Sequence, residues 1–156
     1  MLNALRLAGV CAVLAAGLIT SASARGSVDV DLKGHVTSGP DGELDFAVEA
    51  PEVQGLYPGA EKPMRLAVAN PFAFDLKITS LSGRVSSTSS PSCAPVASNL
   101  QVRAYTGPPS LPMVVPGRDR RPAGSVVLYM PNTVANACQG VRFVIQLDGA
   151  ATKVNK

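Results

Sequence analysis

The chain has 156 residues, with 14 Lys and Arg against 11 Asp and Glu, and its formal net charge at pH 7 is +3. Such a small excess of positive charge argues against nucleic acid or an anionic membrane surface as a partner. The length suits one domain with a hydrophobic core, once any targeting segment has been set aside.

The first 24 residues have the layout of a secretory signal peptide. Arg6 gives the n-region its positive charge, an apolar run of thirteen residues follows, and Ala22-Ser23-Ala24 provides the small-residue cleavage pattern. The run is too short to span a bilayer. We therefore predict cleavage after Ala24, a single mature domain of residues 25 to 156, and a secreted or envelope-associated protein without stable membrane insertion.

The apolar residues of the mature chain alternate with period two, which predicts strands rather than helices. The expected strands cover residues 27 to 36, 44 to 50, 64 to 70, 72 or 74 to 85, 100 to 106, 111 to 115, 124 to 130 and 140 to 149. The turn residues at 38 to 42 predict a hairpin between the first two strands, and a bulge or bend is expected near Gly83 in the fourth. The pattern indicates an all-β protein, an antiparallel sandwich of about seven to nine strands.

Two connections carry candidate interaction residues. Tyr57, in "GLYPG", is expected on a loop at one end of the sandwich, where its ring either binds a partner or closes the end of the core. The stretch 106 to 124 holds five of the thirteen prolines, which suits an edge strand. Within it, Arg118, Arg120 and Arg121 are expected at a hairpin tip, either contacting an acidic partner or simply solvated.

The letters "NACQG" around Cys138 differ by one residue from a local signature of cysteine proteases, Q-A-C-[RQG]-G. A catalytic thiol needs a general base, and the one histidine, His35, lies 103 residues upstream, where that protease pattern places its histidine about fifty residues away. Cys11 leaves with the signal peptide, so Cys93 and Cys138 form an even pair, which in an exported protein indicates one disulfide.

Other chemistries find little support in the sequence. No G-x-S-x-G segment occurs, and the mature chain has neither a histidine pair nor a C-x-x-C motif. Asp29 and Asp31 share a strand face, but no loop of alternating oxygen ligands surrounds them, so a solvated face accounts for them. We predict no enzyme activity and no cofactor or metal.

Several short segments recur together in one known group of proteins. They are "GLYPG" at 55 to 59, "MRLAVANPFAFDLKITSL" at 64 to 81, Cys93 after a Ser-rich loop, "VPG" at 115 to 117, "VLYM" at 127 to 130 and "ACQGVRFVIQLDGAATK" at 137 to 153. In this order they resemble the actinobacterial secreted immunoglobulin-like β-sandwich proteins. The resemblance implies an immunoglobulin-like fold, export and a pairing of Cys93 with Cys138, and it implies no reaction.

The sequence therefore predicts a secreted, non-catalytic β-sandwich module with a structural or binding role in the cell envelope, its partner a protein or a wall polymer. The alternative is an exported inhibitor or small carrier that acts through the Pro-rich stretch 106 to 124.

Overall fold

The computed structural model describes residues 26 to 32, 34 to 37 and 43 to 154 of the chain. Within these ranges the regular structure consists of ten strand segments and one short 3-10 helix, η1 (Asn136–Cys138). The strands are β1 (Gly26–Leu32), β2 (Gly34–Thr37), β3 (Glu43–Glu49), β4 (Val53–Leu56), β5 (Glu61–Ala69), β6 (Leu76–Thr88), β7 (Gln101–Val102), β8 (Met113–Val115), β9 (Arg120–Tyr129) and β10 (Arg142–Lys153).

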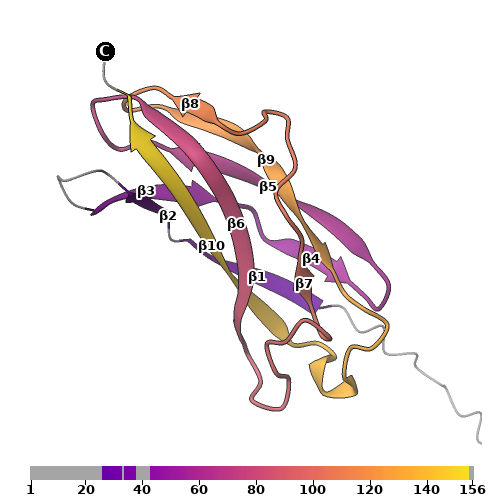
Figure 1. Cartoon of the computed structure of the whole chain (residues 1–156). Helices are drawn as coiled ribbons and strands as arrows, with labels where there is room; N and C mark the ends of the chain where they lie inside the picture. Colours follow the sequence, from indigo (N-terminus) through magenta and orange to yellow (C-terminus); the bar gives the residue numbers. More distant parts are fainter. Residues whose placement is uncertain (1–25, 33, 38–42, 155–156) are drawn as a thin grey trace, which may run out of the picture.

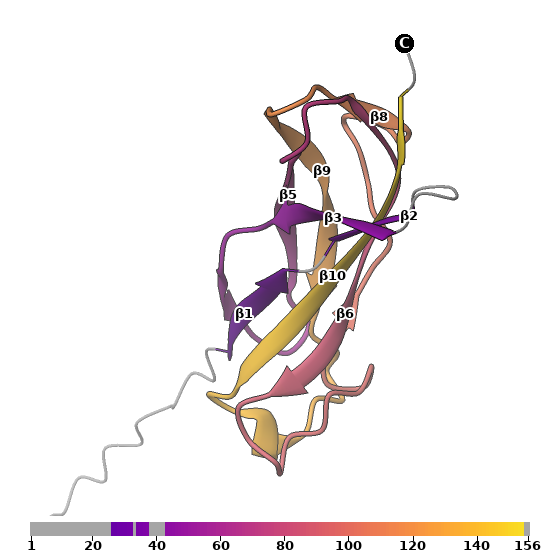
Figure 2. The same cartoon turned by 90° about the vertical axis from the view of Figure 1, so that its left-hand side faces the viewer.

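The strands form two five-stranded sheets that pack face to face, which confirms the predicted all-β sandwich. One sheet has the order β4-β1-β10-β6-β8 and the other β2-β3-β5-β9-β7 (Figure 1). Neighbouring strands are antiparallel except β1 and β10, which run parallel. The two layers are seen from another side in Figure 2.

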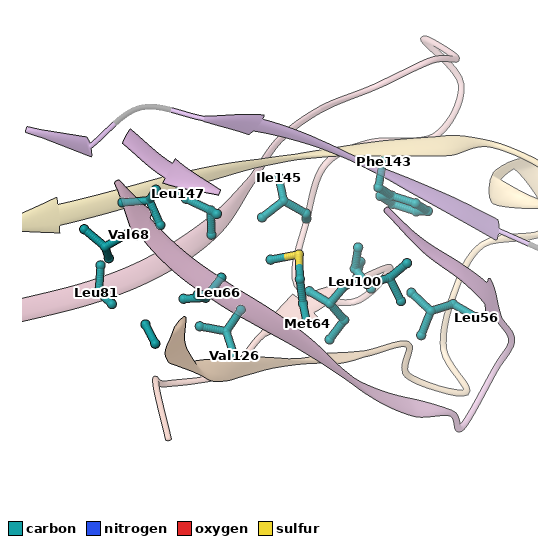
Figure 3. Packing of buried hydrophobic residues seen from close by; sticks show 14 of the residues in the cluster. Leu56, Met64, Leu66, Val68, Leu81, Leu100, Val126, Phe143, Ile145 and Leu147 are labelled. Atoms are coloured by element: carbon teal, nitrogen blue, oxygen red, sulfur yellow. The ribbon is translucent and has the colours of Figure 1, made fainter. Parts of the chain in front are cut away.

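The core lies between the sheets and is built from alternate residues of the long strands. On β10 the predicted inward face is confirmed, because Phe143, Ile145 and Leu147 are fully buried. From the opposite sheet, Met64 and Val68 of β5 are buried as completely (Figure 3). Period two therefore identified the inward faces of these central strands.

The first predicted strand, 27 to 36, is divided between the two sheets. Its first part, β1, pairs with β10 and β4, whereas its second part, β2, pairs with β3. The predicted hairpin is confirmed for the second part, in which Gly34 lies opposite Phe46 and Thr37 lies opposite Glu43. In the sequence, Val28, Val30, Leu32 and Val36 all fall on alternate positions, so the pattern does not mark the division.

The fourth predicted strand has its irregularities at other positions than expected. The register of β6 against β10 shifts at Thr79 and at Ser86, and not at Gly83. Each of these two hydroxyl groups donates a hydrogen bond across the sheet, Thr79 to the carbonyl of Ala150 and Ser86 to that of Val144, both at 3.1 Å. Gly83 remains in the regular ladder.

The segment around residues 100 to 124 is less regular than the sequence suggests. The strand expected at 100 to 106 is reduced to β7 and one bridge between Thr106 and Ser125. β8 pairs with β6 in one sheet, and β9 pairs with β5 and β7 in the other. The turn at 116 to 119 therefore connects two sheets, and the predicted hairpin tip at Arg118 is wrong. The connection expected between residues 50 and 64 also differs, because it contains the strand β4.

We name each end of the sandwich after the contact that holds its loops together, which is the Cys93–Cys138 disulfide at one end and the hydrogen bonds of Asn70 at the other. The disulfide end consists of the loops 57 to 60, 89 to 100 and 130 to 141. The Asn70 end consists of residues 70 to 75 and 116 to 119, with Val154, whose N–H donates to the carbonyl of Asp75 at 2.9 Å. η1 and the last strand's C-terminus lie at opposite ends of the molecule (Figure 1).

Candidate binding site at the disulfide end

Tyr57 begins a tight turn that is fixed to the end of β9. The N–H of Ala60 donates to the Tyr57 carbonyl at 2.9 Å, and Gly59 has φ +82°, as the third position of a type II turn with proline at its second position requires. Gly59 and Ala60 exchange backbone hydrogen bonds with Met130, at 2.7 and 3.0 Å. The Tyr57 side chain is 61% exposed. The ring therefore projects into solvent from a fixed turn and does not close the end of the core, whereas the preceding residue, Leu56, is fully buried.

The predicted disulfide between Cys93 and Cys138 is present, with an S–S distance of 2.04 Å and a Cα–Cα distance of 4.9 Å. Both cysteines are buried. The bond joins the loop after β6 to η1, and it excludes Cys138 as a free nucleophile. The hydroxyl of Thr88 donates to the Cys93 carbonyl at 2.6 Å, so the loop is also tied to the end of β6.

Asn99 braces its own loop with one hydrogen bond and joins it to the loop 130 to 141 with another. Its amide group donates to the Ala94 carbonyl at 2.9 Å and accepts from the Ala135 N–H at 3.0 Å. The hydroxyl of Thr133 donates to the Ser98 carbonyl at 3.1 Å. Asn99 is buried and its bonds are partly shielded from water, whereas the Thr133 bond is exposed. The bonds from Ala135 to Asn99 and from Thr133 to Ser98 hold the two loops together.

A small pocket of about 50 Å³ opens beside the Tyr57 turn. Its lining residues include Pro58, Met130, Val134, Asn136, Cys138 and Gln139. Met130 and Cys138 are buried, whereas the amide side chains of Asn136 and Gln139 are exposed at the rim. The pocket has room for a group of a few atoms, such as a methyl or an ordered water, and not for a whole sugar or aromatic ring.

Sequence reasoning missed these amides. Asn132, Asn136 and Gln139 fall within eight residues around Cys138, and that local density of amides was the available signal. Asn132 lies against the Tyr57 turn, because a Cβ built on Gly59 would be 2.9 Å from its Oδ1 atom. Substituting Gly59 would therefore disturb both the turn and this amide.

The disulfide end carries no formal charge. None of the residues in its three loops is Asp, Glu, Lys, Arg or His. An aromatic ring, a small apolar pocket and neutral amides are groups that bind an uncharged polar ligand through ring contacts and hydrogen bonds. They offer no positive charge to attract a phosphate or a carboxylate.

The three arginines expected to act together lie at the opposite end, so the structure does not bring them near Tyr57. Arg120 pairs with Glu49 at 2.7 Å and Arg121 pairs with Asp119 at 2.8 Å. Arg118 has no ion-pair partner among the described residues. Two of the three positive charges are therefore matched by carboxylates, and the segment is not a concentrated basic patch.

Replacing Arg118 by glycine is expected to stabilise the protein by about 0.5 kcal/mol. Arg118 has φ +56°, a left-handed conformation that costs a non-glycine residue about 1–2 kcal/mol; greater freedom of glycine in the unfolded chain offsets about 0.5–1 kcal/mol of this. Urea unfolding measures the change. Arg120→Gly, in the extended strand β9, is the matched control and should lower the midpoint. Equal losses in both variants would contradict the assignment of strain.

Two sequence-based inferences concern parts of the chain whose positions or side chains are not described. The predicted signal peptide, residues 1 to 24, lies outside the described residues. The backbone of His35 lies in β2 opposite Asp45, and its side chain is outside the description. In the part of the chain that is described, no helix combines the length and the apolar character of a membrane span.

Comparison with known proteins adds no relative. No protein-family model matches this chain, and neither a curated protein nor a solved structure matches it.

Proposed function

We propose that this chain is an exported, non-catalytic, immunoglobulin-like β-sandwich module of the cell envelope, and that its disulfide end binds a neutral wall polysaccharide. The observation that carries the proposal is the exposed Tyr57 ring, held on a fixed turn beside a small pocket with amides at its rim. The absence of charge from the three surrounding loops favours an uncharged polymer over an acidic one.

The chemistry of a sugar ring fits these groups. The C–H bonds on one face of a pyranose pack against an aromatic face, which carries partial negative charge. Amide side chains offer both donors and acceptors, and therefore match hydroxyl groups, which are also both. The pocket, at about 50 Å³, suits one substituent of a ring that stacks on Tyr57 outside it.

Export is supported by three observations of different kinds. Residues 1 to 24 have the layout of a signal peptide, and the resemblance to actinobacterial exported sandwich proteins points to the same route. The Cys93–Cys138 disulfide is compatible with an oxidising, extracellular location.

The test is co-sedimentation of purified residues 25 to 156 with insoluble cell walls stripped of protein. Tyr57→Ala is expected to reduce the bound fraction at least tenfold, since aromatic anchors at binding sites contribute about 2 kcal/mol or more. Its free energy of unfolding should change by less than about 0.5 kcal/mol, because the ring is exposed. Val114→Ala, an exposed valine on β8, is the matched control and should bind as the unaltered chain does. Undiminished binding by Tyr57→Ala would overturn the proposal.

The alternative function, an inhibitor or carrier acting through residues 106 to 124, is now confined to a shorter segment. β8 and β9 occupy residues 113 to 115 and 120 to 124, which leaves the loop 107 to 112 and the turn 116 to 119 outside strands. The Tyr105 hydroxyl contacts the Pro109 carbonyl and accepts from the Gly124 N–H at 2.9 Å, so the first loop has a fixed shape. A tight one-to-one complex with an enzyme, abolished when residues 107 to 110 are replaced, would favour this alternative.

A further inference from the structure

The middle of β6 forms a free sheet edge. β10 pairs with β6 from Leu76 to Thr88, whereas β8, on the other side, pairs only with Leu76, Lys77 and Ile78. In the described ranges, residues 80 to 85 make no backbone hydrogen bond to any segment other than β10. Because successive residues of a strand direct their N–H and C=O groups to opposite sides, about half of these groups point away from β10 and are available to another strand.

This free edge is regular and of defined length. Residues 80 to 85 lie opposite residues 150 to 145 in an unbroken register, and the two shifts fall immediately outside, at Thr79 and Ser86. The hydroxyl groups at both positions bind carbonyls of β10, which fixes the bulges. Bulges bend and twist a strand, so they limit an added strand to about the six residues between them.

A groove of mixed character, mainly apolar, runs beside the free edge. It has a volume of about 340 Å³ and lies between β6 and the segment 95 to 102. Arg84 and Gln101 contribute to its lining, and the apolar lining residues are Val85, Pro95, Val96, Ala97, Leu100 and Val102. Val96 is 45% exposed, one of three large hydrophobic residues with high exposure among the described residues. A strand added to β6 would place its inward side chains in this groove.

The positive charge of Arg84, beside the free edge, favours an acidic added strand over a second copy of β6. Arg84, on the outward face of β6, has a side chain that is 65% exposed. Its contacts are a hydrogen bond to Gln146 at 2.9 Å and a longer ion pair with Asp148 at 3.7 Å. An acidic residue on an added strand would lie across from Arg84 and stabilise the pairing. β6 itself contains no acidic residue, so a second copy of β6 would not supply this pairing.

We propose that residues 80 to 85 of β6 accept an extended segment of a partner protein as an added strand. The segment has apolar side chains facing the groove and an acidic residue facing Arg84. Backbone hydrogen bonds provide the affinity, and the groove and Arg84 provide the selectivity. This site is separate from the disulfide end and does not depend on the polysaccharide proposal.

The test uses ¹⁵N-labelled residues 25 to 156 and a capped hexapeptide of alternating threonine and valine with aspartate at the central threonine. At millimolar concentration the peptide should shift the amide signals of residues 80 to 85 and slow their hydrogen exchange. A matched peptide with lysine should bind about twofold to fivefold more weakly, and Arg84→Glu should reverse this preference. A peptide N-methylated at alternate residues, which cannot complete the ladder, should not bind.

Three further variants test whether the peptide binds in the groove beside β6. Ala97→Arg fills the groove from an exposed position and should abolish peptide binding, while Val114→Arg, an exposed position on β8, should leave it unchanged. Tyr57→Ala should bind the peptide normally, which separates this site from the disulfide end. Unaltered exchange at residues 80 to 85, equal binding of the aspartate and lysine peptides, or protection that depends on protein concentration without peptide would each overturn the proposal.

Discussion

Replacing Asn70 by alanine is expected to lower the free energy of unfolding by about 3 kcal/mol, because one buried amide fastens a whole end of the sandwich. Its nitrogen donates to the carbonyls of Phe74 at 2.8 Å, Val115 at 3.1 Å and Pro116 at 3.0 Å. Its oxygen accepts from the Phe72 N–H at 3.0 Å. Each buried group left without a partner costs about 1–3 kcal/mol, and partial access of water to these loops reduces the sum.

Urea unfolding of Asn70→Ala beside two other variants measures this effect. Asn70→Asp keeps the acceptor but directs a carboxylate at three carbonyls, so it should be at least as destabilising as alanine. Asn136→Ala, an exposed amide at the other end, should change the free energy of unfolding by less than about 0.5 kcal/mol. An Asn70→Ala variant as stable as Asn136→Ala would show that the amide does not fasten this end.

Removing the disulfide by Cys93→Ala with Cys138→Ala is expected to cost about 4 kcal/mol. The bond closes a loop with a sequence separation of 45, and the chain-entropy model gives a stabilisation of this size for such a loop. Since whole domains are stable by only about 5–15 kcal/mol, the loss is a large share of the total. The bonds from Ala135 to Asn99 and from Thr133 to Ser98 still join the same loops, so the folded variant should keep its β structure.

Guanidinium unfolding of the double variant and of the unaltered chain, with and without reductant, tests this expectation. The reductant should lower the stability of the unaltered chain toward that of the variant and leave the variant unchanged. A difference below about 1 kcal/mol between oxidised chain and variant would mean that the loops are held mainly by hydrogen bonds.

The sequence could predict the faces of strands because burial on a strand follows from local alternation. Phe143, Ile145 and Leu147 are inward for this reason, and no knowledge of their neighbours was needed. The pairing of strands with one another could not be predicted in this way. The change of sheet between β1 and β2, and the pairing of β8 with β6, depend on contacts between segments far apart in the chain, which alternation does not specify.

In the candidate site, too, the features set by local sequence were predictable and those set by contacts between distant segments were not. Tyr57 could be identified because Tyr-Pro-Gly encodes a turn locally. The pocket with its Asn136 and Gln139 rim could not be predicted, because its shape depends on η1 and on the turn brought beside it by Met130. Likewise, the charge of Arg120 is met by Glu49, 71 residues away in the sequence, so the apparent basic cluster was visible in the sequence while its counter-charge was not.

The measurement that most directly tests the disulfide end as the binding surface is amide hydrogen exchange of residues 25 to 156 with and without soluble fragments of neutral wall polysaccharide. We expect slower exchange at residues 57 to 60 and 132 to 139, and unchanged exchange at residues 116 to 121. Protection confined to residues 116 to 121, or none at the disulfide end at saturating polysaccharide, would contradict this function.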